Sequence, residues 1–288
     1  MSVIIVTYES DDCIAKCLES LFEFSDIDLS ELEVIVVDNS PKTSARLRNI
    51  VQGYQNTTLI ENEHNSGYGG GNNIGAKVAS GECLLFLNPD TVFIEPVFLS
   101  VLQLYKTDQT LGAIGVTLVS EGMQHNNCYG YFPEKRNIFR LCLDKAIRII
   151  TGNLPKKNIY PWGAALFVKR DDFMRAGLFD ESNFLFHEEP DLCHRLSPKR
   201  SLILSQRIIH MEGATFSSVA WRNKIWMQSL LYYIDKYGFN KNAILRNYII
   251  IYYCWLFKYF LFGRSKMDSV KDLIALMKEA KNKSFIAQ

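Results

Sequence analysis

The first 118 residues alternate short apolar runs with segments of helical periodicity, and this alternation limits the possible folds more than any other feature. Four apolar runs are typical of buried strands, at residues 3–7, 34–37, 59–60 and 83–87. Between the first two runs, apolar residues recur at helical spacing over 14–22, and Asp11 or Asp12 can cap this helix. The alternation predicts an α/β fold whose mostly parallel sheet is covered by helices on both faces.

Composition sets the class of protein. A chain of 288 residues with 48% hydrophobic and 22% charged residues is typical of a globular protein, with room for one large domain and an appendage. The net charge of +1 gives no reason to expect a nucleic-acid partner. The seven cysteines form no C-x-x-C pair, which favours reduced thiols in the cytoplasm over a disulfide framework or a zinc site. A strand that begins at residue 3 leaves no room for a signal peptide.

One carboxylate follows the fourth apolar run directly. Asn88-Pro89 ends this run and leaves Asp90 at the carboxyl end of a strand, where open α/β sheets bind their ligands. An oxygen ligand on rigid backbone is what a hard cation holding a diphosphate requires. The alternative is an ordinary Asn-Pro-Asp turn without a ligand.

Polar segments follow several of the other apolar runs, in a characteristic order. They are Thr7-Tyr8-Glu9, Asp38-Asn39, the glycine-rich run 65–75, Asn88-Pro89-Asp90, and a distal cluster at 179–181 and 187–192. In this order they resemble the inverting glycosyltransferases of family two, which have the GT-A fold. They are most similar to its rhamnosyltransferase-like bacterial branch, which builds cell-surface polysaccharides such as the O-antigen of lipopolysaccharide. The resemblance covers roughly residues 1 to 240.

The resemblance implies a binding site for a nucleotide sugar. It assigns the nucleoside to the first two strand ends, with Asp38 bonding a pyrimidine base. It places the glycine-rich run along the diphosphate and the sugar. The residues implied are Thr7, Tyr8, Glu9, Asp38, Asn39, Asn65, Gly67, Tyr68, Gly71, Asn72, Asn73, Asn88 and Asp90.

Each of these segments also has a plain structural interpretation. Asp38 can simply begin an Asx-turn with Ser40, and the glycine-rich run can be a turn followed by a helix cap. A dinucleotide fingerprint is disfavoured, because the turn after the first strand contains no glycine. A nucleotidyltransferase is disfavoured for a similar reason, since no glycine-rich loop with Lys or Arg follows that strand.

The resemblance also implies a divalent cation, Mg²⁺ or Mn²⁺, and a catalytic base. Asp90 is the last acid of the family's metal-binding pattern, and His210 resembles a late histidine that ligates the metal in some members. Glu189 takes the place of the usual base within Glu188-Glu189-Pro190-Asp191, with Asp191 as its competitor. Trp162 and Gly163 form the floor of the donor and acceptor site, on a strand expected over 162–168. Asn88 and Glu189 depart from the family pattern, so a catalytically silent scaffold of a polysaccharide-assembly complex stays an alternative.

The remaining segments suggest where the acceptor is held. Residues 119–160 mix aromatic residues with Lys and Arg and are interpreted as the acceptor-facing region. The transferase domain is expected to span residues 1–240. Its nucleotide-sugar-binding half is 1–118, and its acceptor-binding and catalytic half is 119–240. Residues 244–288 carry eight Lys or Arg against three acids, and 248–262 are almost wholly apolar. This helical tail, 241–288, is expected to lie on the inner face of the cytoplasmic membrane. The alternatives are packing against the catalytic domain or in a homodimer, and a helix that truly spans the membrane.

The combined prediction is a metal-dependent inverting hexosyltransferase that is peripheral at the cytoplasmic face of the membrane. The donor implied by the resemblance is dTDP-L-rhamnose, with a UDP- or GDP-sugar as the alternative. The acceptor is a hydroxyl of a lipid-linked saccharide or an oligosaccharide.

Overall fold

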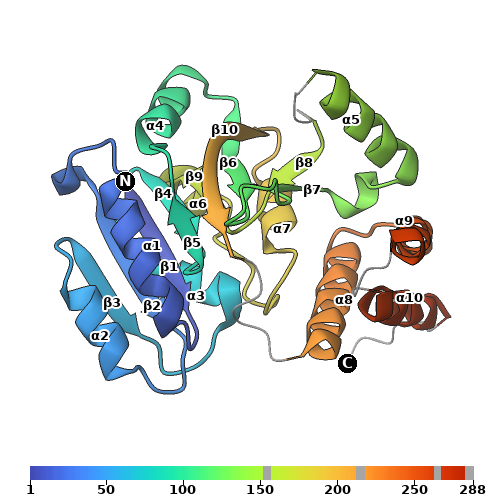
Figure 1. The fold of residues 1–288 in the computed structure, drawn as a ribbon, viewed down its shortest axis with the longest axis horizontal. Helices are drawn as coiled ribbons and strands as arrows, with labels where there is room; N and C mark the ends of the chain where they lie inside the picture. Colours follow the sequence, from blue (N-terminus) through green and yellow to red (C-terminus); the bar gives the residue numbers. More distant parts are fainter. Residues whose placement is uncertain (152–156, 212–217, 263–266, 283–288) are drawn as a thin grey trace. The chain divides into compact units, whose positions relative to one another are not determined.

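A computed structural model describes residues 1–151, 157–211, 218–262 and 267–282 of the chain (Figure 1). Contacts divide the chain into two compact units. Unit 1 consists of Met1–Gly130, Ile159–Phe184 and Glu188–Thr215, and unit 2 of Tyr131–Asn158, Leu185–His187 and Phe216–Gln288. By contacts, residues 219–236 therefore group with the C-terminal helices, whereas the sequence division placed them with the transferase domain.

Unit 1 is built on an eight-stranded sheet in the order β3-β2-β1-β4-β9-β6-β10-β5. The first four strands in this order run parallel to one another, β10 runs parallel to β6, and β9 and β5 are antiparallel to their neighbours. The prediction of an α/β fold with a mostly parallel sheet is confirmed. The strand bounds are β1 Ser2–Thr7, β2 Glu33–Asp38, β3 Thr57–Glu61, β4 Cys83–Leu87, β5 Thr91–Phe93, β6 Leu111–Val119, β9 Ala165–Lys169 and β10 Arg200–His210.

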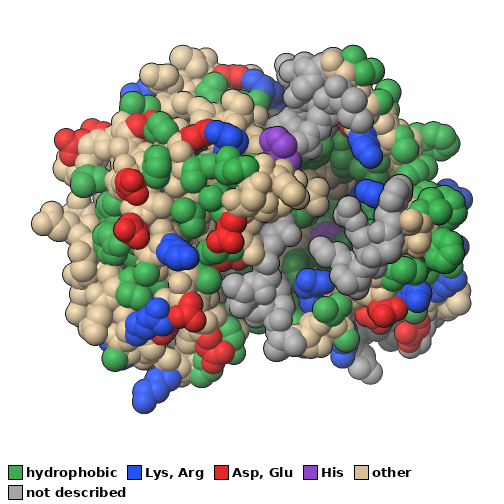
Figure 2. Space-filling model, viewed as in Figure 1, with side chains coloured by type: hydrophobic (Ala, Val, Ile, Leu, Met, Phe, Trp, Pro, Cys, Tyr) green, Lys and Arg blue, Asp and Glu red, His purple; other side chains and the backbone are tan. Residues whose placement is uncertain are grey.

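Helices cover this sheet and carry charged side chains on their outer surfaces (Figure 2). The α1 helix begins at Asp11, but its N-cap is Ser10, without a side-chain cap, so the predicted cap by Asp11 or Asp12 is wrong. Both carboxylates lie in the first turn instead, where the helix dipole stabilises them and where they bind Ser44 and Arg46. The helix bounds are α1 Asp11–Glu23, α2 Ala45–Gln52, α3 Gly67–Val78, α4 Phe98–Thr107, α6 Arg170–Arg175 and α7 Glu188–Arg195, with a 3-10 turn at Leu29–Glu31.

The segment after β6 adds a small second sheet. Strands β7 (Tyr129–Tyr131) and β8 (Ile159–Pro161) pair with each other, and Trp162 donates its backbone N–H to Cys128 at 3.1 Å. The strand predicted over 162–168 begins only at Ala165, as β9. Gly163 stays outside the ladder because its N–H and carbonyl bind side chains from other elements.

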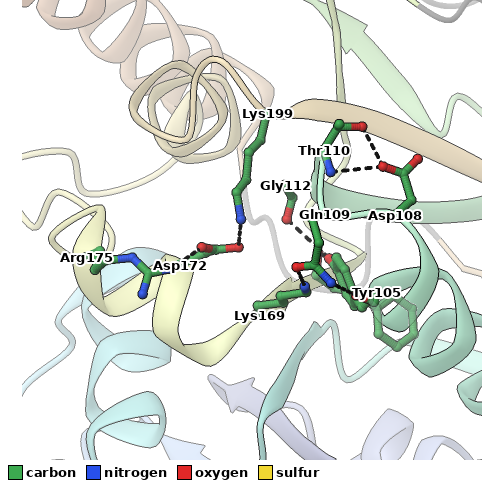
Figure 3. Close-up of polar contacts among 10 residues, drawn as sticks. Tyr105, Asp108, Gln109, Thr110, Gly112, Lys169, Asp172, Arg175 and Lys199 are labelled. Carbon is green, nitrogen blue, oxygen red and sulfur yellow. Dashed lines mark hydrogen bonds and ion pairs between the residues drawn. The ribbon is translucent and has the colours of Figure 1, made fainter.

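A network of polar side chains lies in unit 1, at the end away from the candidate site residues. Tyr105 in α4 donates to the carbonyl of Phe167 in β9 at 2.9 Å, and Lys169 donates to Gln109 at 2.7 Å (Figure 3). Asp172 in α6 is buried and forms ion pairs with both Arg175 and Lys199 (Figure 3). Because every charged group here has a partner, this cluster holds α4, α6 and β9 together and needs no ligand.

Unit 2 is helical. It contains a 3-10 turn at Pro133–Lys135 and the helices α5 Ile138–Thr151, α8 Val219–Lys236, α9 Lys241–Phe262 and α10 Met267–Asn282. Helices α8, α9 and α10 enclose one apolar core, to which Leu230, Leu245, Tyr248 and Met277 contribute fully buried side chains. Among the helices that the structure describes, no helix is both long enough and apolar enough to cross a membrane.

Candidate functional site

The ends of β1 and β2 place Thr7 beside Asp38. The two residues are partners in the parallel register, and the Thr7 hydroxyl donates to Asp38 Oδ1 at 2.9 Å. The hydroxyl of Ser40 donates to the same oxygen at 2.7 Å. Asp38 Oδ2 is buried and has no hydrogen-bond partner among the described residues. An unsatisfied buried carboxylate oxygen is costly, so this atom is a ready acceptor for a donor group of a ligand.

Tyr8 and Glu9 continue from the end of β1. Glu9 is exposed with a φ of 49°, and its N–H donates to Ser40 Oγ at 2.8 Å. Tyr8 is half-buried. The left-handed turn at Glu9 is therefore held to Ser40, two residues beyond the buried Asp38.

Asn39 joins the strand ends to the start of α3. Its amide donates to the carbonyl of Gly67 at 2.9 Å, and its side-chain oxygen accepts from Asn62 at 2.8 Å and from Ser66 at 3.3 Å. Asn65, which is exposed, accepts from the N–H of Gly67 at 3.0 Å. The side chain of Asn39 therefore bonds to other protein groups, and it holds the start of α3 in place beside the end of β2.

The glycine-rich run forms helix α3, and its glycines face protein atoms at close range. A Cβ at Gly71 would lie 2.8 Å from Val6, and one at Gly69 would lie 3.1 Å from Phe179 and 3.6 Å from Glu188. Gly67 adopts a φ of 73° against the carbonyl of Phe184. These glycines let α3 pack against β1 on one side and against the start of α7 on the other.

The two asparagines of α3 differ in what they leave available. Asn73 donates to the carbonyl of Phe179 and to Glu181, both at 2.9 Å, and accepts from the N–H of Phe179. Asn72 donates to the carbonyl of Tyr68, but its buried Oδ1 has no partner in the part of the chain that the structure describes. Of this pair, Asn72 can offer an acceptor to a ligand, whereas Asn73 holds the loop after α6.

Antiparallel pairing of β5 with β10 brings Asp90 and His210 together, although they are far apart in the sequence. His210 Nε2 lies 3.3 Å from Asp90 Oδ1 and 3.4 Å from the amide nitrogen of Asn88. His210 Nδ1 is buried without a partner in the described residues. The predicted metal ligands therefore converge at the carboxyl end of β4, but no group of three His, Cys, Asp or Glu side chains is described around them.

Helix α7 presents the predicted base. Glu189 Oε1 accepts the N–H of Gly163 at 2.7 Å, and Gly163 in turn accepts from the hydroxyl of Tyr68 at 2.8 Å. Burial raises the pKa of Glu189, and the Gly163 N–H opposes this shift by stabilising the carboxylate. A carboxylate with a raised pKa that is held by one oxygen can accept a proton at the other.

Its neighbour Glu188 is more deeply buried. Burial, and then the nearby Glu189 and Asp191, raise the pKa of Glu188 well above its usual range. Glu188 Oε1 has no partner among the residues described, and burial next to two further acids favours the neutral form of this carboxyl.

Asp191 is engaged by a basic residue one turn later. Arg195 donates to Asp191 Oδ2 from Nε at 2.9 Å and from Nη2 at 2.7 Å. Sequence reasoning missed Arg195, although an acid and a base four residues apart on a helix were a sufficient signal. Trp162 is half-buried next to Gly163.

His187, part of the distal cluster, lies directly before α7 and has a structural role. It is buried with a φ of 65°, and its ring packs edge-to-face on Trp226 at 5.2 Å between centroids. The hydroxyl of Ser229 donates to the carbonyl of Leu185 at 2.6 Å. These contacts place Leu185–His187 in unit 2, and no local pattern in the sequence indicates them.

Comparison with known proteins identifies the family of the chain. Residues 2–160 match the model of the family described as "Glycosyl transferase family 2". The chain is 29% identical over 213 residues to rhamnosyltransferase WbbL of Escherichia coli, with 68% of this chain and 76% of that protein covered. It is 28% identical over 202 residues to the low-salt glycan biosynthesis hexosyltransferase Agl10 of Haloferax volcanii, with 68% and 61% covered.

Solved structures show the same fold. The mannosyltransferase PcManGT from Pyrobaculum calidifontis, determined with GDP-Man and Mn²⁺, has a TM-score of 0.57 at 20% identity, with 82% of this chain and 63% of that chain covered. Residues 1–349 of S. aureus TarS give a TM-score of 0.52 at 14% identity, with 99% and 92% covered. The chain thus has the GT-A fold, and it spans less than two thirds of the mannosyltransferase chain.

Proposed function

The chain belongs to glycosyl transferase family 2, and from this membership we propose that it is an inverting transferase with Glu189 as its base. The ionised Glu189 removes the proton of an acceptor hydroxyl as that oxygen attacks the anomeric carbon of a nucleotide-diphospho-sugar. The bond to the diphosphate breaks in the same step, and a single displacement inverts the configuration.

The observation that supports this proposal is the hydrogen bond between Glu189 and the N–H of Gly163. It anchors one carboxylate oxygen to rigid backbone, so the other keeps a defined direction. Asp191 is the poorer candidate because its carboxylate forms an ion pair with Arg195, which donates two hydrogen bonds to Oδ2. Glu188 is poorer as well, because burial favours its protonated form, and a protonated carboxyl cannot act as a base.

The donor's nucleoside is proposed to bind over Asp38. Its buried Oδ2 can accept the N3–H of a pyrimidine, and the hydroxyls of Thr7 and Ser40 hold its other oxygen. Asn72 Oδ1 is a second acceptor, on the helix that packs against both β1 and α7. The diphosphate and the sugar would lie between these two acceptors and Asp90.

The residues at the end of β4 fit a divalent cation in part. Asp90 and His210 supply an oxygen and a nitrogen ligand within 3.3 Å of each other, with Asn88 beside them. Two protein ligands leave most of the shell to diphosphate oxygens and water. When bound, Mg²⁺ or Mn²⁺ would supply charge neutralisation for the departing diphosphate.

Similarity to a rhamnosyltransferase supports dTDP-L-rhamnose as the donor. The alternative is a GDP- or UDP-sugar, since a structural neighbour was solved with GDP-Man. For the acceptor we propose a hydroxyl of a lipid-linked saccharide in cell-surface polysaccharide synthesis. The protein would work at the cytoplasmic face of the membrane, held there through its basic and aromatic C-terminal region.

A thermal-shift panel tests the donor. The protein is heated with dTDP-, UDP-, GDP- or CMP-linked sugars, each with and without Mn²⁺ or Mg²⁺. A nucleotide present at a hundred times its Kd stabilises the native state by about 2.7 kcal/mol, so one nucleotide class should raise the melting temperature. The rise should need the cation and should vanish in Asp38→Ala. If no nucleotide shifts a well-folded sample, the catalytically silent scaffold becomes the better interpretation.

A pair of variants tests the base. We expect Glu189→Gln to retain donor binding while turnover falls at least about a hundredfold, the usual contribution of general base catalysis. Asp191→Asn is the matched control. If Asp191→Asn loses turnover and Glu189→Gln keeps it, the base is misassigned.

A further inference from the structure

Helix α5 of unit 2 exposes a continuous apolar stripe. Its members follow the helical spacing of three and four residues, and Phe139 and Ile150 are 84% and 81% exposed. The stripe consists of Phe139, Cys142, Leu143, Ala146, Ile147 and Ile150. Isolated apolar residues on a surface are ordinary, but a stripe over three turns of one helix marks an interaction surface.

Helix α9 exposes a second stripe of the same kind. One side of α9 packs into the core of unit 2 through Leu245, Tyr248 and Tyr252, and the opposite side is also apolar. Phe257 and Phe260 there are 66% and 73% exposed. The exposed members are Ile250, Tyr253, Cys254, Phe257, Phe260 and Leu261. A helix that is apolar on both sides has one side left to bury.

The two helices contact each other within unit 2. Arg136, just before α5, places its guanidinium 4.8 Å from the ring centre of Tyr248 and 5.9 Å from that of Trp255, both in α9. Hydrophobic side chains are visible on the surface of unit 2 where α5 and α9 lie (Figures 1 and 2). In α10, by contrast, the apolar residues Val270, Ile274 and Met277 are buried in the core.

Charge is divided very unevenly between the two units. The sequence of unit 2 carries 19 Lys or Arg and six Asp or Glu, a net charge of +13, whereas unit 1 carries 13 and 25, a net charge of −12. The near-zero charge of the whole chain conceals this division. Helix α9 contains no acid, and the single acid of α5, Asp144, is bound by Tyr131 and Arg140.

We propose that α5 and α9 together form the docking face of unit 2 for an anionic lipid bilayer. Both stripes enter the bilayer at the level of the head groups, and the basic side chains of unit 2 bind the lipid charge. Exposed Trp255, Tyr253 and the phenylalanines suit this depth, because aromatic residues favour the membrane interface. A second copy of the chain is the poorer occupant, since it would bring two units of +13 together.

This assignment extends the contact proposed for the C-terminal region to residues 138–151, which the sequence placed with the acceptor. It also changes how that contact must be tested. Deleting residues 244–288 would remove Leu245, Tyr248 and Met277 from the core and unfold unit 2, so loss of binding would be uninformative. The vesicle assay needs neither donor nor acceptor, and its result is separate from transferase activity.

Two exposed cysteines allow a direct test. Both proteins carry Cys13→Ser, because Cys13 is partly exposed. Adding Cys254→Ser leaves Cys142 as the exposed thiol among the described residues, and adding Cys142→Ser instead leaves Cys254. Each protein is labelled with an environment-sensitive fluorophore and mixed with vesicles of phosphatidylglycerol and phosphatidylcholine, or of phosphatidylcholine alone. We expect a blue shift from both labels with the anionic vesicles only. A shift from Cys254 without one from Cys142 would remove α5 from the face, and equal shifts with neutral vesicles would remove the role of charge.

Sedimentation with the same vesicles gives the energetic test. We expect Phe139→Gln/Leu143→Gln and Phe257→Gln/Phe260→Gln each to weaken partitioning at least about tenfold. The matched control, Val78→Gln/Leu99→Gln, changes exposed apolar residues of unit 1 and should bind normally. Unchanged binding by the α5 variant, or a dimer in solution that this variant dissociates, would overturn the proposal.

Discussion

Gly163→Ala perturbs the proposed base without touching it. An added Cβ would lie 2.8 Å from Glu189 Oε1 and 2.7 Å from the hydroxyl of Tyr68, both inside normal contact distance. Both distances are below 3.0 Å, so the Glu189 carboxylate and the Tyr68 hydroxyl must both shift. The displacement breaks the 2.7 Å hydrogen bond from the Gly163 N–H.

The size of the effect follows from that bond. A hydrogen bond to a charged group contributes about 1.5–3 kcal/mol, and one pKa unit corresponds to about 1.4 kcal/mol. The N–H of Gly163 lowers the pKa of Glu189 against the effect of burial, so its loss should raise this pKa. Because the base must be ionised, the acidic limb of kcat/KM should move to higher pH by the same amount.

The assay is the pH profile of sugar transfer for both proteins, with the donor that the thermal-shift panel identifies. Displacement of the base should also lower the plateau rate by about a hundredfold. Gly122→Ala is the control, because a Cβ there would meet only Ser120, at 3.8 Å. An acidic limb at the same pH in Gly163→Ala, with a normal plateau, would refute both the role of Glu189 and the reasoning on its pKa.

Three further predictions concern other parts of the site. Asp90→Ala should abolish transfer and the cation-dependent part of nucleotide binding, measured by calorimetry, and unchanged activity would remove Asp90 from the site. Asp38→Asn replaces an unsatisfied acceptor by a donor and should weaken binding of the matching nucleotide by about 1–3 kcal/mol, with Asp28→Asn as an exposed control. His187 has its pKa lowered to about 3 by burial and by the charge of Arg136, so the unfolded chain binds the extra proton as pH falls below 6.5. By pH 4.5 this should cost about 2.7 kcal/mol of the free energy of unfolding, measured in urea, and His187→Gln should remove that dependence; identical pH profiles would contradict it.

Local pattern was sufficient for most of unit 1. The strands β1, β2, β3 and β4 follow from short apolar runs, because a strand buried on both faces excludes polar residues. The Asn-Pro pair ends β4 at the predicted place, since proline cannot continue the ladder. The polar residues after these strands were found for the same reason.

Which of those residues face a ligand was not readable from pattern. Asn72 and Asn73 are adjacent and chemically identical, yet Asn73 binds the loop at Phe179 and Asn72 keeps an unsatisfied oxygen. Asn39 likewise serves the framework. The difference depends on contacts between segments far apart in the chain, and no local pattern records them.

The sequence by itself determined the α/β alternation, the acids at the strand ends and the apolar character of α9. Only the tertiary structure decided that Glu189 meets Gly163, that His210 meets Asp90, and that α9 and α5 leave apolar stripes exposed while α10 buries its own. The physical reason is that a helical or strand period reports which residues share a face. What lies opposite that face, whether core, ligand or solvent, is set by packing between distant segments.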